Sequence, residues 1–201
     1  MKKIIKYLYF INYCYNYNNK EELYMNEFKE LYNGDLFRYG TDKIGRWTRK
    51  FLYYFRKAST CKKKVICYYY RFRYRLISQK HGIEIPRTVS IGKGLFICHP
   101  YNITINPNVK IGKNLNIHKG VTIGQENRGK RKGVPCIGNN VWIGINSTIV
   151  GKIVIGDDVL IAPNSYVNCD VPSHSVVIGN PCKIIKKNNA TEHYIENELI
   201  D

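Results

Sequence analysis

Aliphatic side chains recur at every sixth position through the second half of the chain. One ladder of Ile, Val and Leu runs from Ile91 to Val121, and a second ladder follows from Ile105 to Ile123. After an interruption the spacing resumes and continues to Val167. Neither an α-helix nor a β-meander needs such a strict ladder, whereas a coil of three short strands needs one aliphatic residue per strand on its axis. The pattern therefore predicts a mainly β fold in which such coils stack as a parallel β-helix.

A short amphipathic segment precedes the ladders at residues 20–33. Leu23, Phe28 and Leu31 fall on one face at helical spacing, and Gly34 follows them directly. Because glycine commonly ends helices, we expect a short helix that stops at Gly34.

Two further segments extend this helical region. Residues 43–57 predict a helix because four apolar residues recur at spacings of three and four. These residues are Ile44, Trp47, Phe51 and Phe55. Residues 62–79 are basic and rich in aromatic side chains, and we expect a helix there, although Tyr68 to Tyr70 also suit a strand.

The composition changes near residue 83, where glycine and β-branched residues become frequent. Residues 1–80 carry 19 Lys and Arg against 6 Asp and Glu, whereas residues 81–201 carry 13 against 9. We expect four parts along the chain. These are a disordered or mis-started extension (1–24), a basic α-helical region (25–82), the β-helix (83–186) and a polar C-terminal tail (187–201).

The net charge of +17 bears on possible partners. A basic helical region fits contact with nucleic acid, with an anionic membrane surface or with an acidic polymer. A coding bias toward Lys, Asn, Ile and Tyr on solvated faces explains part of the same excess. No nucleic-acid recognition motif accompanies the charge, which argues against DNA or RNA. Peripheral contact with the inner face of a membrane and higher assembly through the helices stay open.

Cysteine usage and the first residues bear on location. The chain has 7 Cys, an odd number, and no pair has the C-x-x-C spacing. This argues against a disulfide framework and a structural zinc site, and it favours the cytoplasm. Lys6 breaks the apolar run at the start, which is too short to span a bilayer, since that needs about 20 apolar residues.

The repeat resembles the hexapeptide-repeat acyltransferases, whose strands wind as a left-handed parallel β-helix. The likeness covers residues 83–186 and is carried by GIEIPRTVSIGKGLFICH, VTIGQENRGKRKGVPCIGNNVWIG and VPSHSVVIGNPCKII. DLFRYG at residues 35–40 resembles the helical lead-in of one branch, the serine acetyltransferases and the enzymes that acetylate polysaccharide sugars. The resemblance implies an acetyl-CoA-dependent O-acetyltransferase that needs no metal. It also implies a homotrimer with active sites between subunits.

The resemblance places a catalytic histidine at His99. Acetyl transfer to a hydroxyl group needs a base that takes the proton, and a histidine with a near-neutral pKa suits this task. The branch orients that histidine with a carboxylate fifteen residues earlier, a position that Glu84 occupies here in place of the usual Asp. The other four histidines do not match the catalytic position. These are His81, His118, His174 and His193.

The resemblance also implies where acetyl-CoA lies. Small residues line the pantetheine groove, and basic side chains meet the phosphates of CoA. The corresponding groove positions here are Gly124, Gly144, Ile145 and Pro163, the last two bulkier than the usual Ala. Arg128, in a basic insert, and Lys183 are the expected phosphate contacts, although a solvated charged loop explains the insert equally well.

Two departures bear on the acceptor. The serine enzymes hold the amino group of serine with an Asp just before the catalytic His, where this chain has Cys98. They hold its carboxylate with an Arg-His pair, where this chain has Gly133 and Val134. Because unpaired charges in a pocket are costly, these positions favour a neutral sugar hydroxyl of a polysaccharide or its precursor. Serine O-acetylation in cysteine biosynthesis is the alternative, and a non-catalytic β-helix binding module is the alternative from another class.

Overall fold

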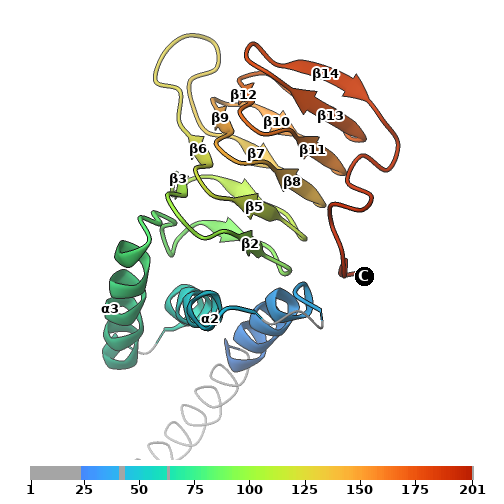
Figure 1. Ribbon diagram of the computed structural model, residues 1–201. Coiled ribbons are helices and arrows are strands. Elements are labelled where there is room, and N and C mark those ends of the chain that lie inside the picture. Colours follow the sequence, from blue (N-terminus) through green and yellow to red (C-terminus); the bar gives the residue numbers. More distant parts are fainter. Residues whose placement is uncertain (1–23, 41–43, 63, 201) are drawn as a thin grey trace, which may run out of the picture.

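A parallel β-solenoid of about five turns stands on a small helical region (Figure 1). The computed structural model describes residues 24–40, 44–62 and 64–200. The predicted mainly β fold, a parallel β-helix preceded by helices, is confirmed. The extension expected over residues 1–24 lies outside the described residues except for its last position.

Three parallel sheets form the faces of the solenoid. The first contains β1 (Ser90–Ile91), β4 (Lys110–Ile111), β7 (Cys136–Ile137) and β10 (Val154–Ile155). The second contains β2 (Phe96–Cys98), β5 (Asn116–His118), β8 (Val141–Ile143), β11 (Val159–Ile161), β13 (Ser175–Ile178) and β14 (Lys183–Lys186). The third contains β3 (Thr104–Ile105), β6 (Thr122–Gly124), β9 (Thr148–Val150) and β12 (Tyr166–Val167). β14 pairs with β13 in the antiparallel sense and ends the second sheet.

The aliphatic ladders fill the axis of the solenoid, as the spacing of six predicts. Ile97, Ile117 and Ile143 pair in register on successive coils, and all three are buried. Serine takes two ladder positions, and both hydroxyl groups donate to the carbonyl oxygen of Ala162, from Ser147 over 3.0 Å and from Ser165 over 2.7 Å. Each buried serine is therefore satisfied at little cost to the core.

The first helix spans described residues 24–37, so the predicted stop at Gly34 is wrong. A Cβ atom at Gly34 would lie 3.1 Å from Cδ1 of Leu199 and 3.1 Å from Cβ of Lys93. Glycine at this position lets the helix pass close to the first coil and the C-terminal segment. Of the apolar face predicted for this helix, Phe28 is buried, whereas Leu23 lies outside the described residues.

Two longer helices complete the base. α2 (Arg46–Thr60) buries Phe51 and Phe55, as the periodicity predicts. α3 (Lys64–Lys80) settles the open choice for the third segment, because Tyr68 to Tyr70 are helical. None of the described helices has the length and hydrophobicity needed to cross a bilayer.

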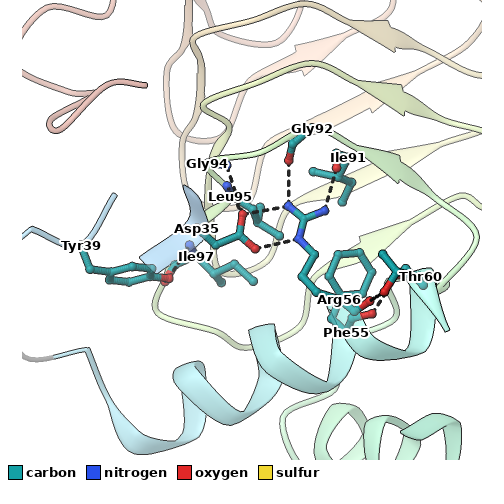
Figure 2. Close-up of polar contacts among 11 residues, drawn as sticks. Asp35, Tyr39, Phe55, Arg56, Thr60, Ile91, Gly92, Gly94, Leu95 and Ile97 are labelled. Carbon is teal, nitrogen blue, oxygen red and sulfur yellow. Dashed lines mark hydrogen bonds and ion pairs between the residues drawn. The ribbon is translucent and has the colours of Figure 1, made fainter. Parts of the chain in front are cut away.

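A buried ion pair joins the helical region to the first coil (Figure 2). Arg56 of α2 donates from Nε and Nη2 to the two carboxylate oxygens of Asp35, over 2.7 and 2.8 Å. Its guanidinium also donates to the carbonyl oxygens of Ile91 and Gly92, each over 2.7 Å. The Asp35 carboxylate accepts from the backbone of Leu95 as well, over 2.8 Å. Burial raises the pKa of Asp35, and Arg56 and the amide donors oppose that rise.

The C-terminal segment runs back along the solenoid toward the helices (Figure 1). Near the last coils, Asp158 accepts from the backbone N–H groups of Ala190 and Thr191, each over 2.9 Å. Near the first coils, Asn114 and Leu199 exchange two hydrogen bonds of 3.1 Å. One segment therefore contacts coils at both ends of the stack.

Candidate active site

His99 lies in a corner of the first coil that is two residues longer than the corner above it. β2 pairs with β5 so that Cys98 faces His118, and β3 pairs with β6 so that Thr104 faces Thr122. Five residues therefore connect β2 to β3, where three connect β5 to β6. His99 adopts a positive φ of 54° at the start of this enlarged corner, and its side chain is exposed. A base on such a projection can reach a substrate without disturbing the coil.

Aromatic side chains from the helical region brace the same corner. His81, just after α3, stacks on Trp47 of α2 at a centroid distance of 3.8 Å and on Tyr101 at 4.5 Å. Its Nδ1 lies 3.1 Å from the carbonyl oxygen of Pro100. The backbone N–H of Asn102 donates to the carbonyl of His81 over 3.0 Å. His81 does not match the catalytic position in the sequence, yet its contacts hold the loop that follows His99.

Glu84 occupies the position directly below the third sheet. Its backbone forms a parallel bridge with Thr104, with hydrogen bonds of 2.7 Å from its N–H to Ile103 and 2.9 Å from Ile105 to its carbonyl. The side chain is exposed, and among the described residues no hydrogen bond joins it to His99. One coil of separation therefore places the two predicted residues on adjacent levels of the stack.

Cys98 and His118 form a half-buried pair beside His99. They face each other across β2 and β5, and burial raises the pKa of the Cys98 thiol. Burial, together with the smaller effect of the nearby charge of His99, lowers the pKa of His118 to about 4. Two imidazoles therefore lie close together, and the inner one is neutral at physiological pH.

Three of the predicted groove positions, Gly144, Ile145 and Pro163, lie together, whereas Gly124 lies at the end of the neighbouring strand β6. Gly124 ends β6, and a Cβ atom there would make ordinary contact with Val150 at 3.5 Å. Gly144 lies in the corner before β9, where a Cβ atom would come within 2.6 Å of the backbone nitrogen of Pro163. Gly144 thus permits close packing of two coils, while a side chain at Gly124 would fit in ordinary contact with its neighbours. Ile145 is half-buried and Pro163 is exposed, both near Gly144.

The basic insert projects from the solenoid between β6 and β7 (Figure 1). Its base is closed by two backbone hydrogen bonds of 3.0 Å between Glu126 and Gly133. Arg128 is exposed on this loop, and Lys183 is exposed at the other end of the solenoid on β14. Val134 is half-buried and packs against the core.

A cavity of about 170 Å³ lies on the outer face of the second sheet. Arg38 and Tyr39 from the end of the first helix line it, together with sheet residues and part of the C-terminal segment. The sheet residues are Phe96, Asn116, His118 and Trp142, and the C-terminal residues are His193, Tyr194, Glu196 and Asn197. Neither His99 nor Glu84 lines it, although His118 places its edge next to the enlarged corner. The DLFRYG segment contained Arg38, but its role could not be seen without the fold.

Comparison with known proteins identifies the relatives of this chain. Residues 137–169 match the family model for the bacterial transferase hexapeptide (six repeats). Serine acetyltransferase of Helicobacter pylori is 40% identical over 106 residues, which cover 53% of this chain and 62% of that protein. Serine acetyltransferase of Staphylococcus epidermidis is 43% identical over 117 residues, with shares of 56% and 55%. The chain therefore matches less than two thirds of the length of these relatives.

A solved structure agrees with these sequence relatives. The crystal structure of Neisseria gonorrhoeae serine acetyltransferase in complex with serine superposes with a TM-score of 0.62 at 25% identity. The superposition covers 83% of this chain and 73% of that one, so it includes helices as well as the solenoid.

These relatives overturn the predicted sugar acceptor, because they are serine acetyltransferases. The prediction considered only the repeat positions Cys98, Gly133 and Val134 as partners for a charged acceptor. Folding brings Arg38 and Glu196 to the second sheet from segments outside the repeat. The resemblance to the hexapeptide-repeat transferases, and among them to the serine acetyltransferases, is therefore confirmed.

Proposed function

We propose that this chain is a serine O-acetyltransferase that uses acetyl-CoA. The observation that carries the proposal is the enlarged corner that projects His99 from a hexapeptide solenoid whose relatives are serine acetyltransferases. Elsewhere the coils need no extra residues at this corner, so the projection fits a chemical task better than a packing task.

In this mechanism His99 acts as general base. Its imidazole takes the proton of the serine hydroxyl as that oxygen attacks the thioester carbonyl carbon of acetyl-CoA. The tetrahedral intermediate then collapses, the carbon–sulfur bond breaks, and the imidazolium returns the proton to the leaving thiolate of CoA. The products are O-acetylserine and CoA. Glu84 is the proposed orienting carboxylate, which favours one tautomer of His99 and stabilises its charged form.

A homotrimer completes the donor site in this proposal. Gly124 ends β6 and Gly144 lies in the corner before the neighbouring strand β9, so the two positions border opposite sides of the third sheet, and we propose that a second copy packs against one of these sides to close the groove. Arg128 and Lys183 would meet CoA phosphates, while Ile145 and Pro163 would border the pantetheine. Light scattering of the purified protein gives the subunit number directly.

Peripheral contact with an anionic membrane is proposed for α3. Six of its apolar residues are exposed, and four of them follow one another at helical spacing along one face. The exposed set is Val65, Ile66, Tyr68, Tyr69, Phe72 and Leu76. The helix contains Arg71, Arg73 and Arg75 and no acidic residue. Aromatic side chains beside basic ones suit the membrane–water interface, so we place the enzyme in the cytoplasm at the inner membrane face.

The test of the proposed activity is release of CoA thiol from acetyl-CoA with and without L-serine. We expect release that depends on serine and is lost in His99→Ala with the fold intact. If a folded trimer released no CoA thiol either with or without L-serine, the proposed activity would be refuted and a binding module would be favoured. A His174→Gln protein is the matched control, because His174 is exposed at the far end of the solenoid.

A further inference from the structure

The cavity on the second sheet contains a buried cation, Arg38, which forms no direct ion pair among the described residues, although the carboxylates of Glu198 and Glu196 act on it at longer range. Arg38 is 2% exposed and donates to the carbonyl oxygen of Glu196 and to Oδ1 of Asn116. Both acceptors are neutral, and Nε of Arg38 has no hydrogen-bond partner among the described residues. Burial lowers the pKa of Arg38 to about 10, and the more distant charges of Glu198 and Glu196 oppose that fall only in part. A buried guanidinium in this state attracts a carboxylate, which it can bind through two parallel hydrogen bonds.

The same cavity offers one carboxylate. Glu196 lines the cavity, is exposed to solvent, and acts on Arg38 at longer range without forming an ion pair with it among the described residues. A cation and a carboxylate that border one small space, yet do not neutralise each other, match a ligand that carries both charges. Asn116 holds Arg38 and the carbonyl oxygen of Tyr194 in place with its side-chain amide, and Trp142 adds an aromatic wall.

The size and position of the cavity restrict the ligand further. A volume of about 170 Å³ admits a small organic molecule and excludes CoA. His118 lines its edge and faces Cys98, the neighbour of His99, across the strand pair. A ligand held here therefore lies beside the enlarged corner that carries the proposed base.

We infer that this cavity binds a small zwitterionic α-amino acid, with its carboxylate on Arg38 and its ammonium group on Glu196. The inference rests on the proposed function and deepens it, since it assigns the acceptor's charged groups to residues outside the repeat. It also explains how a chain with Cys98, Gly133 and Val134 at the usual anchor positions accepts serine.

Trp142 provides a direct binding signal that does not depend on turnover. The chain has two tryptophans, so Trp47→Phe leaves Trp142 as the fluorescent reporter inside the cavity wall. We titrate this protein with L-serine, with glycerate, which lacks the ammonium group, and with 2-amino-1,3-propanediol, which lacks the carboxylate. Serine should change the emission at concentrations about 10-fold lower, or lower still, than either analogue, since a hydrogen bond to a charged group contributes at least that factor.

Variants separate the two charges. Glu196→Gln should weaken serine binding by about 10-fold or more and leave glycerate unchanged. Arg38→Gln should weaken the binding of serine and of glycerate alike. If this variant proves poorly folded, Arg38→Lys replaces it, and because it keeps the charge it should retain part of the binding of both ligands. Glu192→Gln is the matched control, because Glu192 lies on the same segment but does not line this cavity.

Each outcome decides between the two proposals. Serine turnover with an unchanged KM in Glu196→Gln and Arg38→Lys, or no response of Trp142 to serine, overturns the amino-acid site and leaves the acetyltransferase standing. A Trp142 response that follows the predicted charge pattern in a protein without serine turnover supports the site and refutes the proposed activity.

Discussion

Removing Arg56 should destabilise the junction between the helices and the solenoid strongly. Arg56→Met leaves the carboxylate of Asp35, which is 0% exposed, without its cation. The amides of Gly94 and Leu95 still donate to that carboxylate, at 3.1 and 2.8 Å, but they carry no net charge. Breaking a buried pair from one side costs about 3–5 kcal/mol. Against a total stability of about 5–15 kcal/mol, this is a large share.

Urea unfolding followed by far-UV circular dichroism and by tryptophan fluorescence measures this change. Trp47 lies in α2 and Trp142 in β8, so in a Trp142→Phe background fluorescence reports the helical region while circular dichroism reports the whole chain. Arg49→Met is the matched control, because Arg49 is exposed on the same helix, and its change should stay within about 0.5 kcal/mol. If Arg56→Met lowered the free energy of unfolding by less than about 1 kcal/mol, the reasoning would be refuted. Asp35 would then not depend on Arg56 to balance its buried charge.

The double variant tests how the cost arises. Replacing Asp35 by Leu together with Arg56→Met removes both charges, and such replacements of buried pairs are often neutral. Here the N–H groups of Gly94 and Leu95 lose their acceptor, and each buried unpaired group costs about 1–3 kcal/mol. The double variant should therefore recover part of the loss and stop short of wild-type stability.

Three other predictions address chemistry, surface and pH. His99→Ala should lower kcat by about 10²- to 10⁴-fold in the thiol-release assay, and Glu84→Gln should lower kcat less. A wild-type rate in folded His99→Ala would exclude His99 as the base. Phe72→Asp should weaken binding to phosphatidylglycerol vesicles, measured by co-sedimentation, by about 10-fold or more. Val154→Asp, at an exposed position on a strand, should leave this binding unchanged, and an equal loss in both variants would contradict the role of α3. The pKa of His118 falls to about 4 from its ordinary 6.5, so the unfolded chain binds the extra proton in that window and stability declines as pH falls from about 6.5 to about 4. His118→Gln should flatten that decline in a series of melting temperatures, and an unchanged slope would contradict the burial of the imidazole.

The solenoid was predictable because its signal is local and repeated. Each aliphatic residue such as Ile117 occupies the same environment as its neighbours one coil away, so the spacing of six carries the fold without tertiary information. The helix stop at Gly34 failed for the opposite reason. Glycine is needed at that position because Leu199 and Lys93 pack against it. Both residues lie far away in the sequence and come close only in the folded chain.

The candidate site divides in the same way. His99 and Glu84 could be proposed because a motif fixes their spacing, and the extra corner length at His99 is visible in the register. Arg38 and Glu196 could not be proposed, since 158 positions separate them and no pattern links them. The one available signal was the charge of Arg38 within DLFRYG, which the apolar pattern of the first helix does not require.

The returning C-terminal segment changes how the stack should come apart. In a solenoid each coil contacts its nearest neighbours, so the terminal coils can fray independently and unfolding spreads along one dimension. Here a single strap holds Asp158 on a late coil and Asn114 on an early one, and it reaches Arg38 in the helical base. Fraying at either end must then release the other, which couples coils that share no interface and favours loss of the whole stack in one cooperative step.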